Sequence, residues 1–281
     1  MCFNASTNVV GGTVQNSANF MVYAAEDPDV DWIFVASPQV VEEARNLGFS
    51  HAVKCLELSP AHSRASRREL LKYVKEKKSR LVYTMAGPAY VQFPVCHVMG
   101  CSNPYLTNLD WISLRHDRTP LEIFLMVART AYQAFYIRKA NAWIFQTESS
   151  RQGFMKRFFV SHGMTNVVPN ALGRAFGDRG CEKLPNFDKE IIEGIYPAAS
   201  YPHKAHKIIP DVLFVLKGMG LPYKVKIKVT LVKGSKGEKR LFDFAEKRGV
   251  SDCIENIGPF SYVDAPKILN EAEFVFFPSI L

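Results

Sequence analysis

The sequence has 281 residues, of which 47% are hydrophobic, and it carries a formal net charge of +8. This length and apolar content suffice for two packed domains and exclude a disordered chain, and no apolar run approaches the roughly 18 residues of a membrane-spanning helix. The charge indicates an anionic partner, a phosphorylated small molecule or an acidic membrane surface, because the zinc-finger spacings, aromatic RNP-like motif and basic tail of nucleic-acid-binding proteins are missing.

The first part of the chain alternates strand-like apolar runs with helical patterns. Strands are predicted at residues 2–6, 31–37, 51–58, 80–87, 95–100, 142–147 and 166–171. Helices are predicted between several of these strands, at residues 38–48, 63–80, 120–140 and 150–163, the last ending at Gly163. Such alternation predicts a parallel sheet that is covered by helices on both faces.

The helix predicted at residues 63–80 is the densest basic segment of the chain. Leu70, Leu71 and Val74 mark one apolar face, and arginine and lysine occupy the rest. This pattern is typical of a solvated amphipathic helix, which is the favoured interpretation. The alternative is a peripheral contact with an anionic membrane surface.

The cysteines and the start of the chain bear on the compartment. The six cysteines are scattered through apolar runs, as reduced core thiols would be. The cluster Cys96, His97 and Cys101 lacks a second ligand pair at finger-like spacing, so we expect a packing role and no metal site. Since Met1 leads directly into a predicted strand, without a basic and apolar leader, the expected location is the cytoplasm, with a position at the inner face of the membrane as a variant.

A second alternating series follows a change in composition. Residues 172–190 are polar, contain glycine and proline and lack periodicity, as is typical of a linker. Strands are then predicted at residues 191–198, 223–232, 253–258 and 273–278, and helices at residues 203–220, 238–249 and 262–272. The sequence therefore predicts an α/β protein with two Rossmann-like, doubly wound domains, residues 1–171 and 191–281.

Candidate binding residues lie in the strand-to-helix loops, where open α/β sheets bind their ligands. Gly11 and Gly12 precede the first helix, and a glycine pair there lets backbone amides approach a phosphate, although a tight turn needs glycines equally. His203, Lys204 and Lys207 open the first helix of the second domain. Cations at a helix N-terminus oppose the helix dipole unless an anion binds there, and solvated lysines at a frayed end are the alternative.

Taken together and in this order, several segments resemble those of GT-B-fold glycosyltransferases of the group 1 or family-four type. They are NVVGGTVQNSANF, YTMAGPAYVQF, HVMGCSNPYLTN, FQTESSRQGFMKRFF, YPHKAHK and IGPFSYVDAPKILNEAEFVFFPS. Members of this family transfer a sugar from a nucleotide-sugar donor to an acceptor hydroxyl with retention of configuration. The resemblance implies a carbohydrate or glycolipid acceptor, no cofactor and no metal.

The resemblance also implies how the donor diphosphate is held. The glycine pair would face the diphosphate from the first domain, and Lys204 would neutralise it from the second, with Lys207 as a further contact. Many family members carry an arginine about five residues before the lysine, where this chain has Ala199. Lys207 or His203 could replace that arginine.

Further roles follow from the same resemblance. Gly258 matches the loop that lies against the nucleobase. His97 is the catalytic candidate, and Asn103 and Tyr105 are the candidates for acceptor and sugar contacts, because the segment VCHVMGCSNPY places the three at or just past a strand end. A hydrogen-bonded structural histidine is the alternative for His97. Glu148 matches a family loop, but a helix-capping role is favoured for it.

The last predicted strand, residues 273–278, should be the fourth parallel strand of the second domain. In the resembling family a glutamate closely follows the next Pro-Ser turn, and this sequence stops at residue 281. The resemblance thus implies an incomplete second domain, weak donor binding and essentially no sugar transfer by this chain. A non-catalytic relative that binds a partner, and an unrelated two-domain binding protein or isomerase, are the alternatives.

Overall fold

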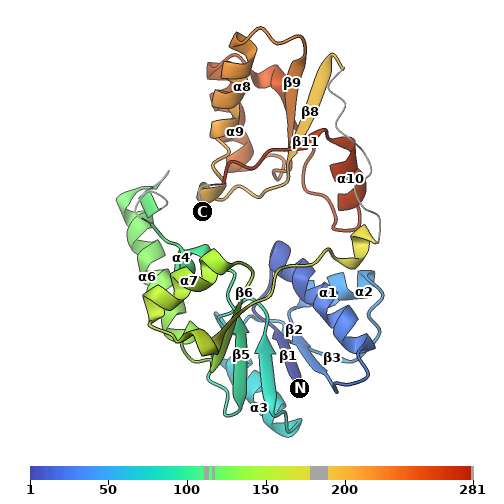
Figure 1. The fold of residues 1–281 in the computed structure, drawn as a ribbon, viewed down its shortest axis with the longest axis vertical. Helices are drawn as coiled ribbons and strands as arrows, with labels where there is room; N and C mark the ends of the chain where they lie inside the picture. Colours follow the sequence, from blue (N-terminus) through green and yellow to red (C-terminus); the bar gives the residue numbers. More distant parts are fainter. Residues whose placement is uncertain (111–113, 116–117, 178–188, 280–281) are drawn as a thin grey trace. The chain divides into compact units, whose positions relative to one another are not determined.

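The computed structural model describes residues 1–110, 114–115, 118–177 and 189–279, which form two compact units. The first unit contains Met1–Asp110 and Thr119–Arg174, and the second contains the remaining chain. Each unit is built on its own parallel sheet (Figure 1). The predicted α/β class with two Rossmann-like sheets is confirmed. Most of the predicted linker, residues 178–188, lies outside the described residues.

The first unit has a seven-stranded sheet in the order β3-β2-β1-β4-β5-β6-β7. Its strands are β1 Cys2–Ala5, β2 Ile33–Ala36, β3 Val53–Cys55, β4 Leu81–Thr84, β5 Cys96–Gly100, β6 Ala142–Phe145 and β7 Thr165–Val167. All adjacent strands pair in parallel. The strand order reverses between β1 and β4, so the loops after these two strands diverge and leave a crevice for ligands at the carboxyl edge.

Helices of the first unit pack against both faces of the sheet, as predicted. They are α1 Gly12–Glu26, α2 Pro38–Asn46, α3 Arg64–Glu76, α4 Pro104–Thr107, α6 Pro120–Ile137 and α7 Glu148–Phe158. One core cluster joins α1 and α2 to the sheet, and a second joins α3, α6 and α7 to the opposite face. Side-chain oxygens of Ser37, Ser63, Thr119 and Thr147 cap four of these helices.

The predicted end of α7 at Gly163 is wrong. The helix ends at Phe158, and Phe159 adopts a left-handed conformation with φ of 54°. His162–Met164 then form a separate 3₁₀ turn. Phe159 is 92% exposed, so its apolar character added to the helical pattern of the sequence without contributing to the core.

The second unit has a four-stranded parallel sheet in the order β10-β9-β8-β11. Its elements are β8 Ile191–Tyr196, α8 Ile208–Gly218, β9 Lys224–Val229, α9 Lys236–Lys247, β10 Ile254–Asn256, α10 Ala265–Glu271 and β11 Phe274–Val275. As predicted, β11 is the fourth parallel strand. None of the described helices in either unit is long and apolar enough to cross a bilayer.

Strand β9 gives the second sheet one apolar and one charged face. Val225, Ile227 and Val229 pack in the core with α8 and α9, which cover the same side of the sheet (Figure 1). The alternate residues are lysines, and Lys228 Nζ lies 3.0 Å from an Oε of Glu193 on the neighbouring strand. Strands covered on both faces are apolar throughout, so the alternation in β9 identifies the charged face as less covered.

Gly194 in β8 fixes the position of the two-residue strand β11. The ring of Phe274, its register partner, lies over Gly194, and a Cβ at this glycine would lie 2.3 Å from Phe274 Cζ. We therefore predict that Gly194→Ala destabilises the protein by about 1–3 kcal/mol, the usual range for overpacking a core. Urea unfolding measures this change.

The Gly194 prediction has a matched control and a rescue. Gly218→Ala places a methyl group at a glycine whose Cβ would have no neighbour within 4 Å, so no loss is expected. Phe274→Leu should restore part of the stability lost in Gly194→Ala. Equal stability of Gly194→Ala and the unmodified protein would contradict this account of β11.

Candidate functional site

The loop after β1 presents uncapped amides at the start of α1. Gly11 has φ of 64° and ψ of −153°, a conformation that favours glycine, and Gly12 is the first residue of the helix. No side chain caps this end of α1, and its first turn contains no acidic residue. Both glycines are exposed, so the first turn offers its amides and its dipole to an anion. The predicted phosphate contact fits this geometry and stays a prediction.

An uncharged pocket of about 330 Å³ lies at the carboxyl edge of the first sheet. Residues of α1 and residues that end or follow β4, β5, β6 and β7 line it, and none of them is Asp, Glu, Lys, Arg or His. Aromatic and apolar walls come from Phe20, Tyr83, Met85 and Phe145. Asn16, Ser102 and Gln146 add amide and hydroxyl groups. Such a pocket suits an uncharged ligand with apolar faces and a few hydroxyl groups.

His97 does not lie at the carboxyl end of its strand, which corrects its predicted placement. It is the second residue of β5, three residues before Gly100, and it is 1% exposed. Its Nε2 lies 2.8 Å from Thr84 Oγ1, which also accepts a hydrogen bond from Asn4 Nδ2, and its ring packs edge-on against Phe93. The side chain therefore belongs to the core, which favours the structural alternative over contact with a sugar.

Asn103 and Tyr105 do follow β5, as predicted, and both form hydrogen bonds there that hold neighbouring helices. Asn103 Oδ1 accepts a hydrogen bond from Tyr105 N at 3.0 Å and caps α4, a four-residue helix that the sequence did not predict. Asn103 Nδ2 donates to Gln133 Oε1 of α6 at 2.9 Å. The carbonyl of Tyr105 accepts from Arg157 at 2.8 Å. Their acceptor role stays a prediction.

Glu148 occupies the first turn of α7, the helix-terminal position favoured from the sequence. Its Oε1 accepts hydrogen bonds from Gln152 and Arg151 at 3.0 and 2.8 Å. The hydrogen bond from Gln152 and that from Arg151 hold the pKa of Glu148 below its usual value. This carboxylate is thus ionised and engaged within its own helix.

Lys204 is a half-buried cation at the carboxyl edge of the second sheet. It ends the 3₁₀ turn Pro202–Lys204, and Tyr196, the last residue of β8, donates its hydroxyl to the Lys204 carbonyl at 2.8 Å. Its Nζ lies 5.0 Å from the ring centroid of Phe277, which follows β11. No described carboxylate pairs with it, and burial lowers the pKa of its ammonium group. A bound anion would provide the missing counter-charge.

The other basic residues of this edge are arranged differently from the sequence prediction. Helix α8 begins at Ile208, so His203 and Lys204 lie in the preceding turn and only Lys207 is at its N-cap. The His203 ring stacks on Tyr201 with centroids 5.7 Å apart, and burial lowers its pKa. Lys207 lines a small hollow of about 70 Å³ that Arg240 also lines.

Arg240 is the residue at this edge that sequence reasoning missed. It lies on α9, far along the chain from Lys207, and Gly237 lets the start of α9 approach Ser200 in the loop after β8. A Cβ at Gly237 would lie 2.1 Å from Ser200 Oγ. Arg240 thus lines the same hollow as Ser200, the residue that follows Ala199, where the family arginine was expected. No local pattern in the sequence signals this.

Asn256, which the sequence did not single out, connects two loops of the same edge. Its Oδ1 accepts from the amides of Leu231 and Gly258 at 3.0 and 3.1 Å, and its Nδ2 donates to the Leu231 carbonyl and to Glu238. Gly258, with φ of 80°, follows β10 at the edge where the nucleobase contact is predicted. That contact stays a prediction.

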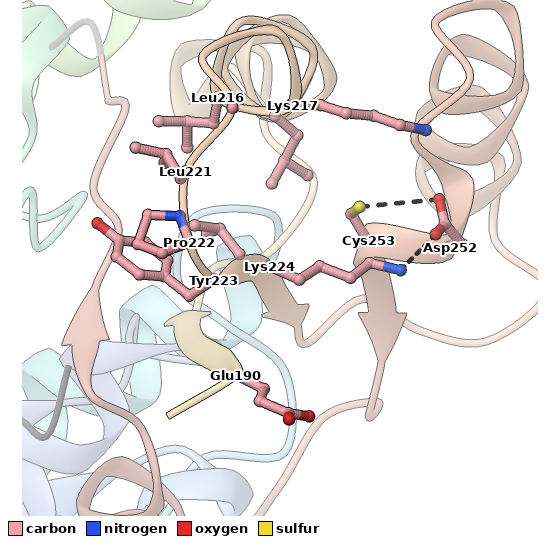
Figure 2. Close-up of a pocket in the computed structure, with 12 residues that line it drawn as sticks. Glu190, Leu216, Lys217, Leu221, Pro222, Tyr223, Lys224, Asp252 and Cys253 are labelled. Carbon is pink, nitrogen blue, oxygen red and sulfur yellow. Dashed lines mark hydrogen bonds and ion pairs between the residues drawn. The ribbon is translucent and has the colours of Figure 1, made fainter. Parts of the chain in front are cut away.

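A larger pocket, of about 440 Å³, lies at the opposite, amino edge of the second sheet (Figure 2). Glu190, Tyr223 and Asp252 precede strands β8, β9 and β10, and Lys224, the first residue of β9, forms an ion pair with Asp252 whose atoms are 2.5 Å apart. Open parallel sheets bind ligands at their carboxyl edges, so its size does not make this pocket the candidate site. Among the described residues, no group of three or more His, Cys, Asp or Glu is placed to hold a metal ion.

Comparisons with known proteins give structural relatives only, because no protein-family model and no curated protein matches the sequence. A glycosyltransferase from Rickettsia africae ESF-5 has a TM-score of 0.67 and 11% identity, and the match covers 99% of this chain and 73% of that one. Anabaena Alr3699/HepE, in complex with UDP and glucose, has a TM-score of 0.61 and 12% identity, and the match covers 99% of this chain and 73% of that one. UDP-GlcNAc 2-epimerase from Neisseria meningitidis, bound to UDP-GlcNAc, has a TM-score of 0.55 and 9% identity, and the match covers 98% of this chain and 76% of that one. The predicted GT-B fold is confirmed, and at such identities the likeness concerns the fold alone.

The burial of His97 predicts a loss of stability in mild acid. Burial lowers the pKa of His97 to about 4, against an ordinary value near 6.5 in the unfolded chain. Between these pH values the unfolded state binds the extra proton, so stability should fall by up to about 3 kcal/mol as the pH drops from 6.5 to 4. Urea unfolding across this range measures the loss. His97→Gln, which does not titrate, should show a flatter profile, and parallel profiles for the two proteins would contradict the prediction.

Proposed function

We propose that this chain binds a nucleotide-sugar donor and that the reaction it serves is transfer of the sugar, with retention of configuration, to a hydroxyl of a carbohydrate or glycolipid acceptor. In this proposal the carboxyl edge of the second sheet holds the donor nucleotide and diphosphate. The corresponding edge of the first sheet receives the acceptor.

The half-buried charge of Lys204, which no carboxylate among the described residues pairs, carries the proposal. A diphosphate leaving group accumulates negative charge as the sugar departs, and a fixed cation stabilises that charge in the transition state more than in the ground state. Tyr196 holds the backbone turn that carries Lys204 at the end of β8. Lys207 and Arg240 add positive charge at the same edge.

The uncharged pocket of the first unit supports the acceptor assignment. Sugars present hydroxyl groups together with apolar C–H faces, which suit aromatic walls such as Tyr83 and Phe20 and amide groups such as Asn16 and Gln146. Because no Asp, Glu, Lys, Arg or His side chain lines this pocket, an uncharged sugar or glycolipid segment fits it better than a phosphate does.

An isomerase that acts on a nucleotide sugar is the second candidate, since the Neisseria epimerase shares the fold. Both functions need donor binding at Lys204. They differ in the need for an acceptor, so the products formed from a bound donor, with and without acceptor, distinguish them. A non-catalytic protein would bind the nucleotide and release no product in either case.

We predict that Lys204→Ala weakens the binding of a nucleoside diphosphate or its sugar conjugate at least about tenfold. The physical reason is the loss of a charge-assisted contact with the diphosphate. Isothermal titration with UDP, GDP and their sugar conjugates measures the change in dissociation constant.

The matched control for Lys204→Ala is Lys247→Ala. Lys247 is an exposed lysine in the last turn of α9, at the far end of that helix from Arg240. Binding should be unchanged in this variant. If the nucleotides bind with the same affinity to Lys204→Ala and to the unmodified protein, Lys204 is not in the donor site.

We also predict that donor binding, and any turnover, survive an excess of EDTA. The lysine and the helix amides would supply the positive charge that a divalent cation supplies in metal-dependent transferases. The measurement is nucleotide titration, with nucleotide release where turnover occurs, before and after chelation and after Mg²⁺ or Mn²⁺ is restored. A strict requirement for either ion would contradict the proposed role of Lys204.

A further inference from the structure

The pocket at the amino edge of the second sheet contains none of the residues that the proposed function uses. Its volume of about 440 Å³ falls within the range of small-molecule sites, about 300–1,000 Å³. Its walls come mainly from the C-terminal half of α8, from residues 220–225 and from residues 252–253. Lys204 and Gly258, by contrast, follow the carboxyl ends of β8 and β10. A ligand in this pocket would therefore occupy a second site.

One side of this pocket is apolar. Leu213 and Leu216 of α8, with Leu221 and Pro222 of the loop that follows, supply aliphatic walls. Leu216 and Leu221 are only partly buried, so a ligand could remove further apolar surface from water. Cys253 is 5% exposed, and burial raises the pKa of its thiol, which is therefore neutral. This side suits an acyl chain or a comparable apolar group.

Two lysines share one carboxylate on the other side of the pocket (Figure 2). Lys224 Nζ lies 2.5 Å from Asp252 Oδ2. Lys217 Nζ donates to the carbonyl of Gly249 at 2.8 Å, which leaves two of its three N–H donors for a ligand. Among the described residues no carboxylate lies within ion-pair distance of Lys217. The hydrogen bond from Lys224 lowers the pKa of Asp252 and the charge of Lys217 adds to this effect, so this side has a surplus of positive charge.

Glu190 limits the negative charge that the pocket accepts. Its carboxylate also belongs to the lining, and Figure 2 shows it apart from Lys217, across the side chain of Lys224. Two acidic and two basic side chains thus line the pocket, which is neutral as a whole. A dianionic phosphate group would be repelled by both acids, whereas a single carboxylate beside Lys217 matches the surplus charge there.

We propose that this pocket is a second ligand site, which binds a monocarboxylate with an apolar body, such as a medium-chain acyl carboxylate. The carboxylate pairs with Lys217, and the apolar body lies between α8 and the loop at residues 220–222. The inference is independent of the proposed transfer reaction, because it uses none of the residues that hold the donor or the acceptor in that proposal.

Isothermal titration of the whole chain with decanoate, below its micellar concentration, tests the pairing of a negative charge with an apolar body. Decanoate should bind at one saturable site, and decanol and decylamine should bind at least about tenfold less well because they lack the charge-assisted contact. Octanoate and hexanoate should bind more weakly by about fourfold for each methylene removed, which corresponds to about 0.8 kcal/mol per buried CH₂. Absence of saturable binding, or tighter binding of decylamine, would overturn the proposal.

Two pairs of variants locate the ligand. Lys217→Ala should weaken decanoate binding about tenfold, and Lys239→Ala, at an exposed lysine of α9 outside the pocket, should leave it unchanged. Leu221→Ser should also weaken binding about tenfold, whereas Met219→Ser, at a residue that is 62% exposed and outside the lining, should not. Urea unfolding checks that all four variants are folded. Equal affinities within either pair would contradict the proposed position of the ligand.

Amide chemical shifts of the ¹⁵N-labelled whole chain give a readout that needs no loss of binding. Decanoate should cause its largest shifts at residues 220–225 and 252–253. Lys204→Ala should bind decanoate like the unmodified protein, because Lys204 lies at the opposite edge of the sheet. If the largest shifts occurred around Lys204 and Phe277 instead, the carboxylate would be bound at the donor edge and the proposal would be wrong.

Discussion

Parallel strand pairing is the constraint on which the rest of this structure depends. Because every strand of a sheet runs in the same direction, each connection must cross back along the sheet, and the loops that leave the strands collect at one edge. In the first unit this edge bears the glycine turn of α1 and the uncharged pocket. In the second it bears Lys204, the loops joined by Asn256 and the chain that follows β11. The amino edges carry the turns that close the crossovers.

The alternation of apolar runs was enough to predict the strands and their parallel pairing, because each strand lies within an apolar run of its own. Positions within a strand were less predictable. His97 lies three residues from the end of β5, and a shift of that size moves a side chain about 10 Å, from the ligand edge into the core. The start of α8 was misplaced for a similar reason, since the turn Pro202–Lys204 has helical composition but 3₁₀ geometry.

Tertiary proximity set the remaining limit on prediction. Arg240 joins the basic edge only because Gly237 and Ser200 come into close approach, and the two segments are far apart in the sequence. The uncharged character of the pocket in the first unit could not be predicted from the sequence for the same reason, since its walls come from one helix and four strand ends. Assembled, the two units differ in electrostatic character: the first has an uncharged pocket at its ligand edge, and the second has several cations at its own. This division matches a neutral ligand in one and an anionic ligand in the other.

The four hydrogen bonds of Asn256 have a consequence for how the second unit meets a ligand. Loops after strands are ordinarily the most mobile parts of an α/β sheet, and ordering them consumes part of the free energy of binding. Here a single half-buried amide group holds the loops after β9 and β10 together and is itself held by Glu238. The two loops therefore move as one body, and a ligand that reaches them finds a surface already ordered, so that less of its intrinsic affinity is lost to conformational entropy.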